Sequence, residues 1–333
     1  MNIEIIKARS TVKESIRNFF TGKGFLEVDT PVLSPFLIPE AAIEVFETEY
    51  FNSKGDPVPM YLTPSPEIFM KRLIAGGIGD IFQMTKSFRN NEQSGRHHNP
   101  EFTMLEWYKT DASAADNIEI TEELFSRIIR ETEGRGYFSP KGDPDSLKPP
   151  FRRVSMEEIF FEKSGVSLSD NRSTEDFAET ARSRGYRIED RGETWESIFN
   201  RIFLTEVEPF LPDDKPLVIY NYPAQIDCLA KDIPGTPWKD RWELYCAGVE
   251  LANCYSEETD PERVSEFCSS EYSIKKRTSK VVPGYDPSFI SAFEKDFPEC
   301  SGTAMGVDRL IQVFTGTDRL EGVILFPLSD ILA

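Results

Sequence analysis

The stretch FRNNEQSGRHHNPEF, from Phe88 to Phe102, contains both histidines of the chain, His97 and His98, and two of its arginines. The flanking segments DIFQMTKSFR and EFTMLEWYKT have the composition and length of strands, which predicts a long antiparallel hairpin with this stretch at its tip. Arginine can grip a phosphate through two hydrogen bonds, and Phe102 can stack on a purine. The loop composition fits a nucleotide pocket and fits a solvated, charged hairpin tip as well. A metal site at the two histidines is disfavoured, because neighbouring residues of an extended chain point in opposite directions.

The bulk composition narrows the class of protein. The 333 residues carry a formal net charge of −19, and 39% of them are hydrophobic, which is ample for a large buried core. An acidic surface repels phosphate backbones, but a few arginines can still bind a small anion locally. No stretch approaches the roughly 18 apolar residues of a membrane span. The five cysteines form no C-x-x-C pair, so we expect reduced thiols in a cytoplasmic protein rather than disulfides or a zinc site.

Strand-like and helix-like segments segregate along the chain, which predicts an α+β fold with helices packed on an antiparallel β-sheet. Helices are predicted over 11–24, over 65–77 with Ser65 as N-cap, over 114–133, over most of 153–213 with caps at Ser155 and Ser173, and after the Asp-Pro pairs at 260–261 and 286–287. Strands besides the hairpin are predicted at 25–33, with a break at Pro31, at 215–223, as a pair within 241–255 and, as a final apolar strand, at 322–328. The segment SGTAMGVDRL, residues 301–310, is interpreted as a glycine-bearing loop that leads into a helix. We expect a single domain over 1–333, with a helical insertion at about 114–213.

Four further residues place charge in an unusual setting. Glu250 and Glu257 lie seven residues apart in an apolar segment, where two carboxylates could hold Mg²⁺ or a bound amine. One inward and one exposed glutamate on a strand is the alternative. Arg309 follows small residues that let a ligand approach closely, so it could bind a terminal phosphate, although an ordinary glycine-rich turn also explains the pattern. Glu67 stands in the first turn of a predicted helix, where it complements the helix dipole or contacts an amine.

Three motifs, in order along the chain, resemble those of class II aminoacyl-tRNA synthetases of the lysyl type. GFLEVDTPVL is similar to motif 1, FRNNEQSGRHHNPEFTMLEWY to motif 2 and GTAMGVDRLIQV to motif 3, and GVELANCYSEETDP is similar to the strand that precedes motif 3. The resemblance covers about residues 8 to 328. Motif 1 begins within about the first 25 residues, so we expect no anticodon-binding barrel. The chain therefore resembles the short lysyl-synthetase paralogues that modify elongation factor P, the elongation factor P–(R)-β-lysine ligases.

The resemblance implies a mechanism and a set of site residues. ATP and Mg²⁺ are the implied cofactors, and lysine or (R)-β-lysine is the implied substrate, which is activated as an adenylate and passed to a lysine ε-amine of elongation factor P. Arg89 and Arg309 are the implied catalytic residues, and Glu250 and Glu257 the implied metal ligands. The implied ATP-binding residues are Arg89, Asn90, Glu92, His98, Asn99, Phe102, Glu250, Leu251, Gly306 and Arg309. The implied substrate-binding residues are Ser65, Pro66, Glu67, Glu106, Tyr108, Asn253, Glu257 and Ala304.

The resemblance also implies a homodimer, because class II cores pair through motif 1, and it implies no stable binding of tRNA. Two alternatives stay open: a lysyl-adenylate-forming paralogue with another protein or a metabolite as acceptor, and a catalytically silent regulatory paralogue. A catalytically silent paralogue is expected to have lost charged residues of the motifs, whereas Arg89, Glu250, Glu257 and Arg309 are all present. The choice between α- and β-lysine is open as well, although Ala304 replaces a glycine of lysyl-tRNA synthetases beside the amino-acid pocket.

Overall fold

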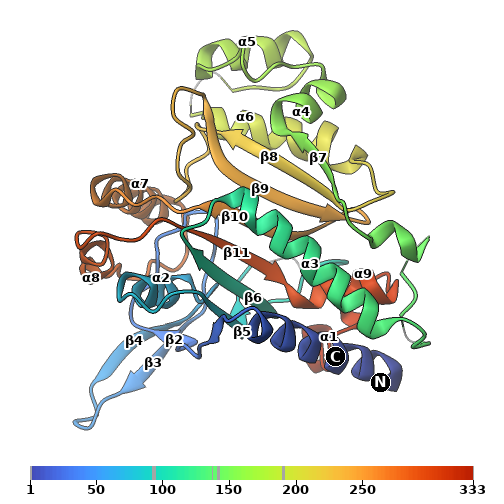
Figure 1. The fold of residues 1–333 in the computed structure, drawn as a ribbon. Helices are drawn as coiled ribbons and strands as arrows, with labels where there is room; N and C mark the ends of the chain where they lie inside the picture. Colours follow the sequence, from blue (N-terminus) through green and yellow to red (C-terminus); the bar gives the residue numbers. More distant parts are fainter. Residues whose placement is uncertain (1, 92–94, 137, 141–142, 190–191, 333) are drawn as a thin grey trace.

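A mixed sheet of eight strands forms the centre of the protein (Figure 1). The computed structural model describes residues 2–91, 95–136, 138–140, 143–189 and 192–332. In spatial order the strands are Leu26–Glu27 (β1), Ile81–Phe88 (β5), Glu101–Thr110 (β6), Cys300–Gly306 (β11), Val249–Ser256 (β10), Trp238–Cys246 (β9), Leu217–Pro223 (β8) and Arg152–Ser155 (β7). The pairs β1–β5 and β7–β8 are parallel and the others are antiparallel. A smaller antiparallel sheet contains Leu33–Ser34 (β2), Pro57–Leu62 (β4) and Glu47–Phe51 (β3).

The α-helices surround the large sheet. They are Ile3–Gly22 (α1), Glu67–Ala75 (α2), Ala114–Thr132 (α3), Met156–Ser164 (α4), Thr174–Ser183 (α5), Trp195–Ile202 (α6), Pro261–Thr278 (α7), Pro287–Ser291 (α8), Val307–Thr315 (α9) and Leu328–Leu332 (α10). Side chains cap several of the predicted starts: Ser155 accepts from the backbone N–H of Glu158, and Asp260 from that of Glu262. Within the described part of the chain, no helix has the length and apolar character needed to cross a membrane.

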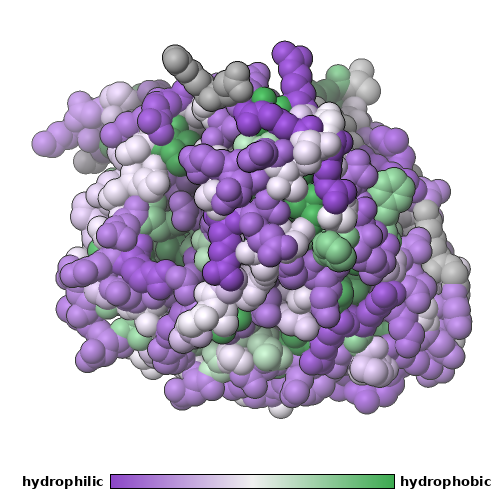
Figure 2. All heavy atoms as spheres, turned by 90° about the horizontal axis from the view of Figure 1, so that it is seen from above, coloured by the Kyte–Doolittle hydropathy of each residue, from purple (hydrophilic) through white to green (hydrophobic). Residues whose placement is uncertain are grey.

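Three hydrophobic clusters join the helices to the sheet. Helices α1, α3 and α9 pack on one face, where Phe20, Phe82, Trp107 and Trp242 are almost fully buried. Helices α4, α5 and α6 pack beside β7 and β8 in a second cluster, and α2, α7 and α8 contribute to a third. Figure 2 shows that the face above α4–α6 is covered mainly by hydrophilic side chains, with hydrophobic ones scattered among them. The apolar faces of these helices are therefore turned inward.

The α+β prediction is confirmed, including the long hairpin formed by β5 and β6. Three predictions of local structure were wrong. The strand expected at 25–33 is instead two short strands, β1 and β2, which belong to different sheets. Residues 300–306 form β11, a central strand between β6 and β10, rather than a loop. Residues 322–328 form no strand: a short 3₁₀ helix over Leu320–Gly322 is followed by bends, with Phe326 66% exposed. An apolar run becomes a strand only when a sheet edge pairs with it, and in the described part of the chain no strand pairs with this run.

Asn117 links α3 to two central strands. Its side chain accepts a hydrogen bond from Trp107 Nε1 at 2.7 Å and donates to Ser301 Oγ at 2.9 Å and to the Ser301 carbonyl at 3.1 Å. The residue is fully buried, so no water can replace these contacts.

We expect Asn117→Leu to lower the free energy of unfolding by about 1–3 kcal/mol for each buried polar group that it leaves unpaired. Urea denaturation of the purified protein measures the change. Glu119→Gln, on the exposed side of the same helix, is the matched control. A stability of Asn117→Leu equal to that of the control would contradict the structural role given to this amide.

Candidate active site

The alternation of side chains along the central strands directs charged residues to one face of the sheet. On β6, Leu105 and Trp107 belong to the core under α1, α3 and α9, whereas Glu106 and Tyr108 line a cavity on the opposite face. On β9, Trp242 and Leu244 belong to the core, while the neighbouring Arg241 and Glu243 line the cavity. The polar face is therefore a consequence of strand geometry.

Two adjoining cavities occupy this polar face, with volumes of about 660 and 330 Å³. The larger cavity is lined by α2, α6 and α7 in addition to the strands, and the smaller by the motif 2 hairpin and the start of α9. Residues that line both include Glu40, Arg89, Arg241, Glu243, Asn253 and Ala304. We call the region formed by these shared residues the junction. One elongated ligand can occupy both cavities by passing through it.

The larger cavity has an acidic end formed by Glu67, Glu106 and Glu257. Lys71 is only 1% exposed and forms ion pairs with Glu67 Oε1 at 2.5 Å and with Glu257 Oε2 at 2.8 Å. The hydroxyl of Tyr255 donates to Glu67 Oε1 at 2.9 Å, and the hydroxyl of Tyr108 donates to Glu106 Oε1 at 2.8 Å. Three carboxylates therefore face a single resident cation.

Two buried oxygens of this acidic end have neither a hydrogen-bond partner nor an ion-pair partner among the described residues. They are Glu106 Oε2 and Glu257 Oε1, and both are buried. Burial raises the pKa of Glu257 to about 8, against the opposing effect of Lys71, and burial together with the charge of Glu67 raises the pKa of Glu106 well above its usual value. Buried acceptors without donors indicate a site for a cationic ligand.

Gly302 on β11 is the floor of the acidic end. A Cβ atom at this position would lie 2.5 Å from Glu257 Oε1 and 2.5 Å from Tyr108 Cε1. Real Cβ atoms do not approach other atoms so closely, so the site requires glycine here. This requirement explains why a central strand contains a residue with low strand propensity.

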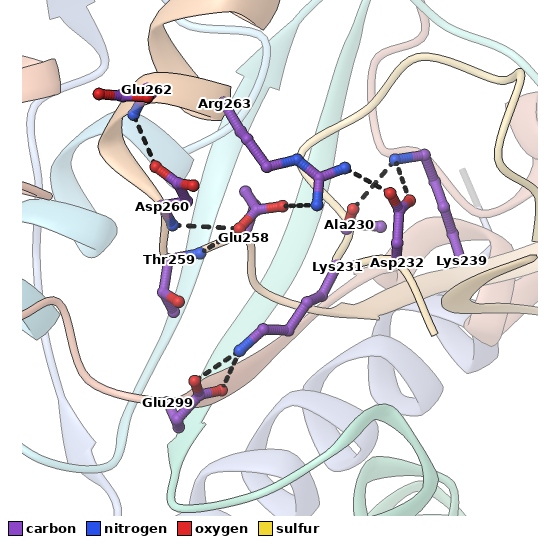
Figure 3. Close-up of polar contacts among 10 residues, drawn as sticks. All are labelled: Ala230, Lys231, Asp232, Lys239, Glu258, Thr259, Asp260, Glu262, Arg263 and Glu299. Carbon is purple, nitrogen blue, oxygen red and sulfur yellow. Dashed lines mark hydrogen bonds and ion pairs between the residues drawn. The ribbon is translucent and has the colours of Figure 1, made fainter. Parts of the chain in front are cut away.

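A network of ion pairs fixes the backbone around Glu257 (Figure 3). Glu258, the next residue, accepts from Arg263 at 3.0 Å, and Arg263 also pairs with Asp232. Lys239 donates to Asp232 at 3.2 Å and to the Ala230 carbonyl at 3.1 Å. The segment that contains Asp232 is joined to the end of β10 through a bridge between Ala230 and Glu257. The network therefore fixes the backbone from which the Glu257 side chain extends to Lys71.

The smaller cavity has a basic end formed by Arg309 and the motif 2 hairpin. Arg309 donates to the His97 carbonyl at 3.1 Å, to the Glu250 carbonyl at 2.8 Å and to His98 Nε2 at 2.9 Å. Arginine cannot accept a hydrogen bond, so His98 presents an unprotonated Nε2 to it. The Arg89 guanidinium lies 5.3 Å from the centre of the Phe102 ring. A guanidinium near an aromatic ring at the junction suits a ligand with phosphate and a planar base.

The predicted site residues fall into two groups in space. Those expected to bind ATP and found along the smaller cavity are Arg89, His98, Asn99, Phe102, Glu250, Leu251, Gly306 and Arg309. Those expected to bind the substrate and found along the larger cavity are Ser65, Glu67, Glu106, Tyr108, Asn253, Glu257 and Ala304.

Three predicted site residues stand apart from these groups. Asn90 lines neither cavity and instead donates its backbone N–H to the Glu44 carbonyl at 2.8 Å. Pro66 is the N-cap residue of α2, one position later than the cap expected at Ser65. Glu92 lies outside the described residues.

The structure does not bring Glu250 and Glu257 together as a pair of metal ligands. Glu250 lies at the start of β10 and Glu257 directly after its end, about 23 Å along the chain at the usual rise of a strand, and they line different cavities. The carboxylate next to Glu250 is that of Glu243: burial and then the charge of Glu243 raise the pKa of Glu250. Magnesium is commonly held by one or two carboxylates and substrate phosphates, so Glu243 and Glu250 fit this ion better than the expected pair.

Sequence reasoning missed five residues of the site: Glu40, Lys71, Arg241, Glu243 and Tyr255. Two of them had a local signal. Lys71 follows Glu67 by one helical turn, a spacing at which side chains meet. Glu243 and Glu250 flank a tight turn at Ala247–Gly248, where both residues have positive φ, so the hairpin places them near each other.

Comparisons with known proteins identify the family of the chain. The family model for tRNA synthetases class II (D, K and N) matches residues 2–330. The lysine–tRNA ligase of Pelotomaculum thermopropionicum is 34% identical over 98% of this chain and 63% of its own length. That of Chloroflexus aurantiacus is 33% identical over 97% of this chain and 65% of its own length. The elongation factor P–(R)-beta-lysine ligase of Yersinia enterocolitica is 33% identical over 96% of this chain and 94% of its own length.

The chain therefore belongs to the class II tRNA synthetases of this group. It spans about two thirds of the length of the lysine–tRNA ligases that it matches, and nearly the whole length of the elongation factor P–(R)-beta-lysine ligase.

The raised pKa of Glu257 predicts how replacing this residue changes the pH dependence of the free energy of unfolding. The folded protein retains the proton up to a pH of about 8, whereas the unfolded chain loses it near 4.5, so raising the pH between these values favours unfolding. We expect the wild type to lose stability relative to Glu257→Gln as the pH rises from 5 to 8, with a slope of up to about 1.4 kcal/mol per pH unit. Chemical denaturation at several pH values measures the free energy of unfolding of both proteins.

Glu266→Gln, on the exposed side of α7, is the matched control and is expected to run parallel to the wild type. Parallel curves for Glu257→Gln as well would mean that Lys71 keeps Glu257 ionised throughout this range.

Proposed function

We propose that this protein activates lysine or (R)-β-lysine with ATP to form an aminoacyl-adenylate. The observation that carries the proposal is the pair of buried, unpartnered oxygens, Glu106 Oε2 and Glu257 Oε1, at one end of a cavity whose other end carries Arg309. An amino acid with a side-chain ammonium complements the acidic end. Its carboxylate then reaches Arg89 at the junction, beside the basic end that suits the phosphates.

The balance of charge favours a diamino acid over a neutral one. When ionised, Glu67, Glu106 and Glu257 carry three negative charges against the single positive charge of Lys71. A neutral side chain in this place would leave these buried carboxyl groups either charged and unpaired, at a cost of several kcal/mol, or protonated with acceptor oxygens that have no donor. A substrate ammonium can instead donate to the two unpartnered oxygens, which makes the same groups responsible for affinity and for rejection of other amino acids.

The chemistry requires positioning and charge neutralisation more than proton transfer. An oxygen of the substrate carboxylate forms a bond to the α-phosphorus of ATP, the bond from that phosphorus to the bridging oxygen breaks, and pyrophosphate leaves. Arg89 at the junction stabilises the charge that develops, Arg309 binds the terminal phosphate, and Phe102 stacks on the adenine. Glu243 and Glu250 would hold Mg²⁺, which neutralises phosphate charge when bound.

For the second step we propose transfer to a lysine side chain of elongation factor P. The acceptor ε-amine attacks the activated carbonyl, the bond to the AMP oxygen breaks, the nitrogen loses a proton and an amide remains. The match along 94% of the elongation factor P–(R)-beta-lysine ligase supports this acceptor. The lysine–tRNA ligases among the relatives support a second candidate, in which the same adenylate serves another acceptor. We propose a cytoplasmic homodimer that acts without stable tRNA binding.

Pyrophosphate exchange tests the first step. We expect exchange of labelled pyrophosphate into ATP that depends on lysine or (R)-β-lysine, and a loss of about 10²–10³-fold in Arg309→Ala, because a donor to the phosphates is removed. Arg319→Ala, at an exposed arginine outside both cavities, is the control.

The absence of exchange with either amino acid in the wild type would overturn the proposed function. Exchange without subsequent labelling of elongation factor P would instead move the proposal to the second acceptor.

Gly302→Ala tests the acidic end. The added Cβ would occupy the space beside Glu257 Oε1 and Tyr108, so we expect exchange to fall by about 100-fold or more with either amino acid while the protein stays folded. Gly22→Ala is the matched control, because a Cβ there meets no atom within 4 Å. Circular dichroism and exchange rates at saturating ATP measure the two effects. Full activity of Gly302→Ala would show that the substrate does not use this end of the cavity.

A further inference from the structure

Glu40 is a carboxylate at the junction that the chemistry above does not use. It lies in the segment between β2 and β3, and it lines both the larger and the smaller cavity. Its neighbours across the junction are Glu67, from the acidic end, and Arg89, from the motif 2 hairpin: the charge of Glu67 raises its pKa and that of Arg89 lowers it. Glu40 thus stands between Glu67, a carboxylate of the acidic end, and Arg89, the group that faces the substrate carboxylate.

The backbone around Glu40 is fixed by α7. Lys275 is 2% exposed and donates its ammonium to the Glu40 carbonyl at 2.8 Å and also to the Ile43 carbonyl. Glu271 Oε2 accepts from the backbone N–H of Ala41 at 2.6 Å. Two polar side chains of one helix therefore hold this short segment against the cavity. A segment fixed in this way presents its side chain in a defined position.

The Glu40 carboxylate makes no hydrogen bond or ion pair with another residue in the described part of the chain, although the backbone of the same residue is tied down. Burial and then the charge of Glu67 raise its pKa to about 7. The cationic groups that oppose this shift are Arg89 and Lys275, and the other acidic group near it is Glu271. A carboxylate held in place without a partner, next to two cavities, is suited to bind a cation supplied by a ligand.

We propose that Glu40, together with Glu67, binds the ammonium group of the substrate that lies next to its carboxylate. This inference rests on the proposed function, in which Glu106 and Glu257 take the distant ammonium and Arg89 the carboxylate. A diamino acid then spans the larger cavity with each charged group opposite a protein group of opposite sign. Glu40 restricts the substrates to amino acids with a second ammonium one or two carbons from the carboxylate, and it excludes simple ω-amino acids.

Binding calorimetry with three probes tests this assignment: L-lysine, (R)-β-lysine and 6-aminohexanoate, which keeps the distant ammonium and the carboxylate but lacks the second ammonium. We expect the wild type to prefer both diamino acids strongly. In Glu40→Gln their affinity should fall by about 10–100-fold, the loss expected for one charged hydrogen bond, while the affinity for 6-aminohexanoate stays within about threefold. Glu266→Gln removes the same charge outside the cavity and is expected to change none of the three affinities.

The unchanged binding of 6-aminohexanoate serves as the internal check that Glu40→Gln is folded with an intact acidic end. Equal loss for all three probes would overturn the assignment, because it would show a general structural role. Wild-type affinity for both diamino acids in Glu40→Gln would overturn it as well. A wild type that binds none of the probes would overturn the proposed function, and this inference with it.

Discussion

Alternate side chains of a β-strand point to opposite faces of the sheet, and this constraint organises both the core and the site of the protein. In β6, β9, β10 and β11, one set of alternate residues packs under α1, α3 and α9, and the other set faces the cavities. Burial of the apolar set, with Trp107 and Trp242 almost fully enclosed, offsets the cost of placing charges on the other face. A slip of one residue would exchange the two sets, so register specifies core and site together.

The acidic end depends on contacts that reach well beyond its three carboxylates. Lys71 from α2 satisfies one oxygen each of Glu67 and Glu257, and the missing side chain of Gly302 leaves room beside the other oxygen of Glu257. Behind them, the ion pairs of Arg263 and Lys239 fix the backbone on which Glu257 stands (Figure 3). Protein donors still leave Glu106 Oε2 and Glu257 Oε1 unpartnered. The scaffold thus keeps these two oxygens out of reach of the protein's own hydrogen-bond donors. A cationic ligand can supply the missing donors.

Much of the fold could be predicted because its signals are local. The β5–β6 hairpin and the helix starts at Ser155 and Asp260 follow from strand composition and capping residues. The strand β11 was missed because its small residues, needed beside Glu257 and Tyr108, are typical of loops. The expected pairing of Glu250 with Glu257 came from their spacing and from the family resemblance, whereas the hairpin turn and the bulge in β10 bring Glu243 to Glu250 instead. The site residues that the sequence did not reveal have neighbours from distant parts of the chain, and tertiary contacts rather than sequence spacing bring these neighbours together.

The segment 114–213 has a part in the site as well as in the fold. Helix α6 supplies Trp195, Glu196 and Asn200 to the wall of the larger cavity, across from Phe267 and Glu271 of α7. The charges of Glu271 and Asp227 raise the pKa of Glu196 further, after burial, so three acidic groups from different elements lie near one another on this wall. Under the proposed function an acceptor amine has to reach the junction after pyrophosphate has left, and the smaller cavity still contains the nucleotide. The larger cavity is then the remaining route, and its acidic wall attracts a protonated lysine side chain toward the activated carbonyl.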